Sequence, residues 1–175
     1  MKIAICSDSH DHIPHLRASV MLANDHGCAA LIHCGDLISP FMLEELARFA
    51  GAVHLIYGNN VGDQHLIASL ILHRFPAITH HGVFGAIEAG GRKIAFHHYP
   101  AMARNLALAG TFDVVCCGHD HTYLVERAGK TLVVNPGELL GKEAQPSFAM
   151  LETDDLTVKR VDVGQPFFPA PLSVR

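Results

Sequence analysis

Short apolar runs alternate with polar turns and longer amphipathic segments through the first part of the chain. The run KIAIC (2–6) is followed by the polar turn SDSHD and by IPHLRASVMLAND (13–25), whose apolar residues recur at helical spacing. The same order returns in two further pairs, CAALIHC (28–34) with FMLEELARFA (41–50), and AVHLIY (52–57) with QHLIASLILHR (64–74). Strands that alternate with helices at this period predict a parallel sheet with right-handed crossovers.

The apolar runs become shorter and more closely spaced from about residue 77. The strand-like runs there are AITHH (77–81), VFGAIEA (83–89), KIAFHH (93–98), DVVCCG (113–118), TYLVER (122–127), KTLVVN (130–135), SFAMLET (147–153) and LTVKRVDV (156–163). The segments GG (90–91) and AGK (128–130) predict hairpin turns, and AMARNLALAG (101–110) predicts one helix. The whole pattern predicts an α/β fold, a four-layer α-β-β-α sandwich of two packed mixed β-sheets flanked by helices.

Length and composition bound the architecture. A chain of 175 residues with 49% hydrophobic content can bury one substantial core, so we expect a single domain over residues 1–175. The five cysteines form no CxxC pair, which favours reduced, buried thiols over a disulfide framework or a zinc–thiolate site. No apolar run is long enough for a signal-peptide core or a membrane span, which predicts a soluble, cytoplasmic protein.

Charge narrows the choice of partners. The formal net charge is -4 and the 13 Lys and Arg residues are scattered, whereas nucleic acid and anionic membranes are normally bound by clustered basic side chains. We therefore expect a small-molecule substrate and no nucleic-acid or membrane partner. The hydrophobic content and the apolar tail PFFPAPL (166–172) are compatible with a homo-oligomer.

The 14 histidines are the unusual feature of the composition, because histidine is the commonest metal ligand. Metal-capable side chains follow the predicted strands at the edge where ligands gather in α/β sheets. They are Asp8, His10, Asp36, Asn59, His97, His119 and His121. Alternation along an extended segment predicts that Asp8 and His10 point the same way, and likewise His119 and His121.

Each of these motifs alone is also typical of an ordinary turn or of exposed strand residues. Together, in this order and each at a predicted strand end, they indicate a metal site. The mixture of imidazole, carboxylate and amide suits Mn, Fe, Ni or Zn better than Mg or Ca, which prefer shells of oxygen only.

The ordered motifs resemble those of a known family. The set Asp8-x-His10, Gly35-Asp36, Gly58-Asn59, His97 and Gly118-His119-x-His121 resembles the calcineurin-like metallophosphoesterase superfamily. The short chain, SDSHD near the N-terminus and NPGE at 135–138 are most similar to its small bacterial and archaeal phosphodiesterase branch. The resemblance implies two divalent metal ions bridged by Asp36. It assigns Asp8, His10, Asp36 and His121 to one ion, and Asp36, Asn59, His97 and His119 to the other.

The resemblance also implies an activity, that of a metal-dependent phosphoesterase, and within this class a phosphodiesterase acting on a small phosphate ester. A hydroxide that bridges the two metals would attack phosphorus in line, and the cations would neutralise the charge growing on the equatorial oxygens. Manganese is the expected metal, with Fe, Ni or Zn as alternatives.

Four positions depart from the family pattern. Asn60 and Val61 stand where the wider superfamily has a histidine and then an acidic residue after the Asn ligand. HHYP replaces the usual His-Gly, so that His98 joins Asn59 as a candidate catalytic residue. His98 would protonate the leaving oxygen or contact the phosphate, unless strand alternation turns it to the side opposite His97. Glu138 in NPGE replaces a serine and would repel a phosphate unless it is paired.

Two other functions stay open at this point. One eukaryotic retromer subunit is similar to this branch and serves mainly as a protein-interaction platform, so the alternative is a catalytically weak or inactive protein-binding scaffold of the same fold. All seven ligand positions are filled, which favours an enzyme. A mononuclear metal hydrolase of another kind would explain His119-x-His121 but would leave Asn59 and Asp8-x-His10 unexplained.

Overall fold

The structure is a computed structural model, and it describes residues 1–165. The strands in this part of the chain are β1 (Lys2–Cys6), β2 (Ala30–His33), β3 (Ala52–Leu55), β4 (Ile78–His80), β5 (Phe84–Ala89), β6 (Arg92–His97), β7 (Val114–Cys116), β8 (Tyr123–Ala128), β9 (Thr131–Pro136), β10 (Ser147–Glu152) and β11 (Val158–Asp162). The helices are α1 (Ile13–Asp25), the 3-10 helix η1 (Pro40–Met42), α2 (Leu43–Leu46), α3 (Gln64–Arg74) and α4 (Pro100–Leu108). The tail PFFPAPL lies outside the described residues.

The strands form two mixed sheets. The first has the order β11-β10-β1-β2-β3-β4, in which β1 to β4 are parallel and β10 and β11 are antiparallel. The second has the order β5-β6-β7-β9-β8, with parallel pairs in the centre and an antiparallel hairpin at each edge. Both predicted hairpins are present, since β5 pairs with β6 across Gly90 and Gly91, and β8 pairs with β9 across residues 129–130.

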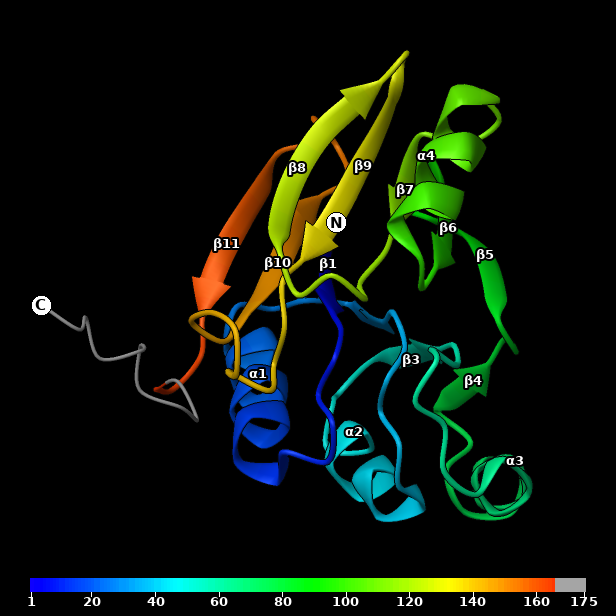
Figure 1. The fold of residues 1–175 in the computed structure, drawn as a ribbon, viewed down its shortest axis with the longest axis vertical. Coiled ribbons are helices and arrows are strands. Elements are labelled where there is room, and N and C mark those ends of the chain that lie inside the picture. The colour runs from blue at the N-terminus through cyan, green and yellow to red at the C-terminus, as the bar shows by residue number, and fades with distance from the viewer. Residues whose placement is uncertain (166–175) are drawn as a thin grey trace, which may run out of the picture.

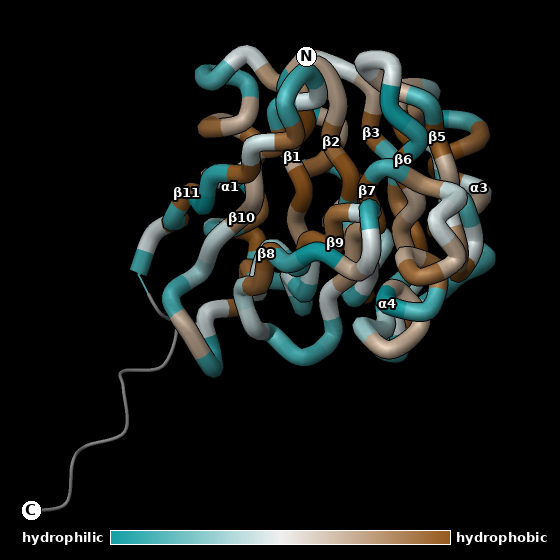
Figure 2. Tube along the Cα trace, turned by 90° about the horizontal axis from the view of Figure 1, so that it is seen from above, coloured by the Kyte–Doolittle hydropathy of each residue, from teal (hydrophilic) through white to brown (hydrophobic). Residues whose placement is uncertain are grey.

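Three layers of apolar side chains hold the sheets and helices together. Helices α1, η1, α2 and α3 pack on the outer face of the first sheet, the two sheets pack against each other, and α4 covers the outer face of the second sheet. Figure 1 shows α1, α2 and α3 together at one end of the molecule and α4 apart from them beside β7. Figure 2 shows hydrophobic residues along the inner strands β1 and β2. The prediction of an α/β fold with two packed mixed sheets and flanking helices is confirmed.

Strand β1 shows how the pattern produces this layering. Ile3 and Ile5 belong to the cluster between the sheets, whereas Ala4 and Cys6 belong to the cluster between the first sheet and the helices α1 to α3. Both faces of the strand are therefore buried, which is why its sequence is continuously apolar and not alternating. Because β1, β2 and β3 are parallel neighbours, their carboxyl ends meet at one edge of the sheet.

The helix predicted over residues 41–50 is shorter than expected. It consists of the 3-10 helix η1 followed by the four residues of α2, and it ends at Leu46. The side chain of Asn24 explains this end, because its amide donates to the Arg48 carbonyl oxygen and its oxygen accepts from the Ala50 N–H. These bonds compete with continued helical hydrogen bonding, as asparagine side chains commonly do.

Among residues 1–165, no helix is both long and apolar enough to cross a membrane.

Candidate metal centre

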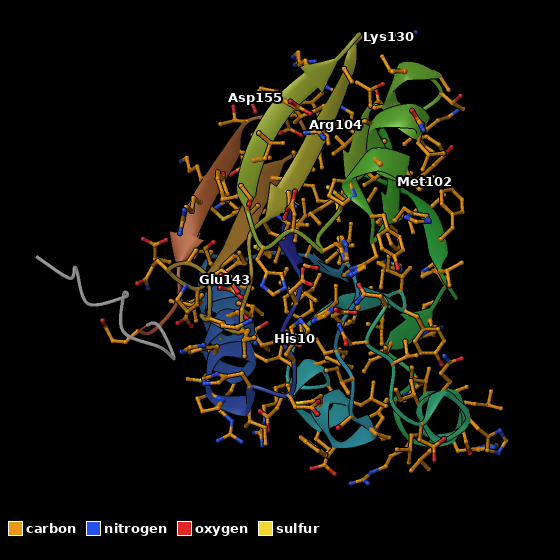
Figure 3. All side chains as sticks on the ribbon, viewed as in Figure 1. His10, Met102, Arg104, Lys130, Glu143 and Asp155 are labelled. Atoms are coloured by element: carbon orange, nitrogen blue, oxygen red, sulfur yellow. The ribbon has the colours of Figure 1, made fainter. Side chains whose placement is uncertain are left out.

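One group of side chains gathers around Asp8, which follows β1. The Asp8 Oδ1 atom lies 3.8 Å from His10 Nε2 and 3.5 Å from His121 Nε2. One ligand atom from each of these three residues lies within 4.8 Å of the others, so that a single cation could contact all three. Figure 3 shows His10 near the centre of the molecule, on the side of the helices α1 and α2.

A second group meets around Asn59, which follows β3. The Asn59 Oδ1 atom lies 2.8 Å from His98 Nε2 and 2.7 Å from His119 Nδ1. His98 Nε2 is also 3.6 Å from Asp36 Oδ1 and 4.0 Å from Asp8 Oδ1. Oxygen and nitrogen atoms of five loops therefore converge on the same small volume.

Asp36 lies between the two groups. Its Oδ2 is 3.5 Å from His10 Nε2 in the first group, and its Oδ1 is the atom near His98 in the second. Asn60 holds the carboxylate from behind, since its backbone N–H donates to Oδ1 at 2.8 Å and its side-chain amide donates to Oδ2 at 2.6 Å. Asn60 stands where the wider superfamily has a histidine, and its place beside Asn59 was the only feature of the sequence that pointed to this support of Asp36.

The structure brings His98, and not His97, to these groups. His97 Nδ1 accepts a hydrogen bond from the Tyr99 backbone N–H at 3.1 Å. His98 is 1% exposed, and its Nδ1 lies 2.8 Å from the carbonyl oxygen of Cys34. Of these two neighbouring histidines, His98 is therefore the one whose ring lies at the second group.

Strand alternation explains this difference. In β6, Ile94 and Phe96 face the cluster between the sheets, while Ala95 faces the cluster under α4. His98 comes two residues after Phe96, so its side chain points to the same inner side as Ile94 and Phe96, where the candidate ligands gather. The signal was present in the sequence, since the two largest apolar residues of the strand mark its inner face.

Five of the residues whose side chains converge here have a left-handed backbone conformation, with positive φ. They are Asp8 (φ 54°), His10 (φ 42°), Asp36 (φ 57°), His119 (φ 76°) and His121 (φ 58°). The predicted alternation along extended segments is therefore not what orients the two D-x-H and H-x-H pairs. Left-handed turns direct them, and Asp, Asn and His are the residue types that enter this region most readily after glycine.

The two histidines of the H-x-H pair accordingly lie in different groups. His121 contacts Asp8, whereas His119 contacts Asn59. The backbone N–H of His119 also donates to Asp8 Oδ2 at 3.0 Å, which links the two loops.

Two glycines allow the loops to come this close. A Cβ atom at Gly58 would lie 2.0 Å from Asp36 Oδ1 and 2.7 Å from the Asp36 backbone N. A Cβ atom at Gly118 would lie 1.9 Å from Ser7 Oγ and 2.5 Å from Asp8 Oδ2. Since such separations are far below van der Waals contact, the glycines before Asn59 and His119 are required by the packing of the carboxylates.

Charge and burial in the centre favour a cation. Burial disfavours ionisation of Asp8, but its contacts with His10, His121 and Ser7 outweigh this effect and hold the pKa of its carboxyl well below the usual value. Contacts with Asp8 and Glu138 raise the pKa of His121 to about 10. The site thus concentrates the negative charge that a divalent ion would compensate.

Unpartnered polar atoms support the same conclusion. Among the described residues, the buried atoms Asp8 Oδ1 and His10 Nε2 have no hydrogen-bond partner. A buried polar atom without a partner is costly, and both atoms point into the volume shared by the first group. The residues present therefore fit a bound metal ion.

A buried histidine connects two of the ligand loops. His33 is fully buried at the end of β2, its Nδ1 accepts from the Gly35 N–H at 3.3 Å, and its Nε2 lies 3.1 Å from Ser9 Oγ. Burial lowers the pKa of His33 to about 4. The neutral ring therefore ties the loop of Asp8 and His10 to the loop of Asp36.

Known proteins are similar to this chain over most of its length. The calcineurin-like phosphoesterase superfamily domain matches residues 1–156. A phosphodiesterase of Methanocaldococcus jannaschii is 31% identical over 160 residues, which cover 88% of this chain and 94% of that protein. A solved structure of a novel archaeal phosphodiesterase has a TM-score of 0.85 and 29% identity, covering 94% of this chain and all (100%) of that one.

A more distant structure, Vacuolar Protein Sorting 29 of Cryptosporidium parvum, has a TM-score of 0.64 and 18% identity, covering 92% of this chain and 96% of that one. At this identity the likeness concerns the fold alone. The family match covers most of the chain, and the more similar relatives carry the same class of activity in their names. This chain belongs to the calcineurin-like phosphoesterase superfamily.

Proposed function

We propose that this protein hydrolyses a small phosphate ester, with a preference for phosphodiesters, at a centre of two divalent cations. The observation that carries the proposal is the pair of ligand groups that share Asp36, with unpartnered buried atoms on Asp8 and His10. The preference for diesters is supported by the relative that is 31% identical and named a phosphodiesterase.

The geometry suggests a revised set of ligands. We assign Asp8, His10, Asp36 and His121 to one cation, and Asp36, Asn59, His98 and His119 to the other. Manganese is the cation we propose, and the same donors also suit Fe, Ni and Zn. Metals of this class, when bound in pairs, neutralise charge on the phosphoryl oxygens and lower the pKa of bound water.

The protein's own residues prepare the site for this chemistry. Asn60 fixes the orientation of the Asp36 carboxylate, so that one oxygen is presented to each ligand group. Cys34 holds His98 through its carbonyl oxygen, which leaves His98 Nε2 directed towards Asn59 and Asp36. With Nε2 committed in this way, we propose His98 as a ligand and not as the general acid.

The first test is an activity assay that also separates the enzyme from the scaffold. Chelator-treated protein should regain turnover of an aryl phosphodiester when Mn is added, and the matching monoester should be a poorer substrate. Protein that binds the metal but turns over neither ester with Mn, Fe, Ni or Zn would favour the scaffold. The likeness to Vacuolar Protein Sorting 29 makes this a necessary control.

The second test compares two neighbouring histidines. The variant His98→Ala should bind one of two cations roughly 10–100-fold more weakly or worse. Loss of a residue that only supports a metal ligand already weakens binding by that factor, and loss of a ligand itself should weaken it at least as much. The matched control His97→Ala should keep both cations, because His97 bonds to the Tyr99 backbone instead. Metal loss in His97→Ala with full retention in His98→Ala would refute the ligand assignment.

A further inference from the structure

Glu138 is a buried carboxylate next to the candidate metal centre. It follows β9 and has no exposed surface (0%). An ionised carboxylate is strongly disfavoured in the interior unless it is paired and hydrogen-bonded. The contacts of its two oxygens therefore indicate why a carboxylate is placed there.

The two oxygens of Glu138 have different partners. Oε1 accepts hydrogen bonds from the backbone N–H groups of Glu143 and Ala144, in the loop between β9 and β10. Figure 3 labels Glu143 in this loop. Oε2 lies 2.7 Å from His121 Nδ1. One oxygen thus anchors a loop, and the other faces a candidate metal ligand.

The opposite nitrogen of the same imidazole faces the metal group. His121 Nε2 lies 3.5 Å from Asp8 Oδ1, within the group formed by Asp8, His10 and His121. A neutral imidazole binds a metal through the nitrogen that carries no proton, so Nε2 can do so only if the proton resides on Nδ1. Among the described residues neither Nδ1 of His121 nor Oε2 of Glu138 has a hydrogen-bond partner, and the two atoms are 2.7 Å apart, so Oε2 is the acceptor within reach of a proton on Nδ1.

We propose that Glu138 is a positioning residue that keeps the proton of His121 on Nδ1 and directs the lone pair of Nε2 to the cation shared with Asp8 and His10. The proposal rests on the metal centre of the proposed function. It also accounts for Glu138 beside a phosphate site, because Oε2 is turned to His121 Nδ1 and Oε1 to the N–H groups of Glu143 and Ala144.

The variant Glu138→Gln tests the proposal with almost no change in size. The amide oxygen can accept from the two loop N–H groups, so the amide NH₂ would face His121 Nδ1 and donate to it. Nδ1 would then need its own lone pair, and the proton would move to Nε2, where it blocks the metal. Calorimetric titration of Mn into chelator-treated protein should show one cation bound roughly 10–100-fold more weakly, with the other within twofold.

The matched control is Glu45→Gln. Glu45 is also a nearly buried, paired carboxylate, but its partners are Arg17 and Arg48 instead of a candidate ligand. This variant should bind both cations as the parent does. Equal affinity of Glu138→Gln and the parent for both cations would overturn the proposal.

A second measurement uses the parent protein and remains decisive if Glu138→Gln does not fold. Nitrogen-15 NMR of the Zn-bound protein should show His121 with its proton on Nδ1 and the metal on Nε2. A proton on Nε2 overturns the proposal. Neither measurement needs turnover, so a parent that binds two cations with this tautomer but hydrolyses no ester would contradict the proposed function and leave the role of Glu138 supported.

Discussion

The buried His33 should make the stability of the protein depend on pH. Its ring is enclosed at the end of β2 and bonds to Gly35 and Ser9, with burial as the main reason why its pKa lies at about 4 instead of 6.5. The unfolded chain would bind a proton near the ordinary value, whereas the folded protein accepts one only near pH 4. Between these values the unfolded state holds more protons, so acidification favours unfolding.

The magnitude follows from the two pKa values. The contribution of His33 is fully present above the unfolded value and is lost as the pH falls towards the folded one. At about 1.4 kcal/mol for each pKa unit, the whole difference corresponds to about 3 kcal/mol. Of this, about 2 kcal/mol should be lost between about pH 7.5 and about pH 5.

Urea unfolding of the chelator-treated parent and of His33→Gln, at about pH 7.5, 6 and 5, measures this loss. The variant has no titratable ring at this position, so its free energy of unfolding should fall by about 2 kcal/mol less over the range. His121, whose pKa is raised to about 10 by Asp8 and Glu138, acts with the opposite sign but is common to both proteins. The reasoning is refuted if both proteins show the same pH dependence, or if NMR titration of the parent finds His33 protonated near pH 6.

Two further predictions concern the packing between the sheets and the close approach of the loops. Phe96→Ala removes a fully buried ring (0% exposed) from the cluster between the sheets and should cost about 3–5 kcal/mol in urea unfolding; a loss below about 1 kcal/mol would contradict that packing. Gly58→Ala should weaken metal binding by about 10–100-fold in calorimetry, because the new Cβ atom would meet both Asp36 Oδ1 and the Asp36 backbone. Unchanged affinity in a folded Gly58→Ala variant would show that Asp36 can move aside.

Periodicity predicted most of the secondary structure because each helix and each strand face packs against one apolar layer, which sets the spacing of its apolar residues. The bounds of α1 and α3 agree with the predicted segments 13–25 and 64–74. The segment 41–50 behaves differently, since Asn24 on another helix takes up the backbone groups that would have continued it. A hydrogen bond between residues this far apart leaves no periodic signal in either segment.

The candidate site could be predicted as a set of residues but not in its detailed geometry. The order of motifs predicted side chains that the structure brings together, except that His98 and not His97 lies at the second group, on the inner face of β6. The pairing of Glu138 with His121 was beyond sequence reasoning, because it joins two segments whose approach is set by the packing of β9 and by the turn after Gly118.

The left-handed backbone of the ligands explains why the rest of the fold is needed. For a residue other than glycine this conformation is unfavourable, by up to about 1–2 kcal/mol, and five residues of the centre adopt it. It can persist only because the three apolar layers fix the strand ends from which these loops begin. The geometry of the ligands is therefore set by the protein before a cation binds, so binding relieves the unpartnered atoms of Asp8 and His10 and stabilises the fold in proportion to the logarithm of cation concentration.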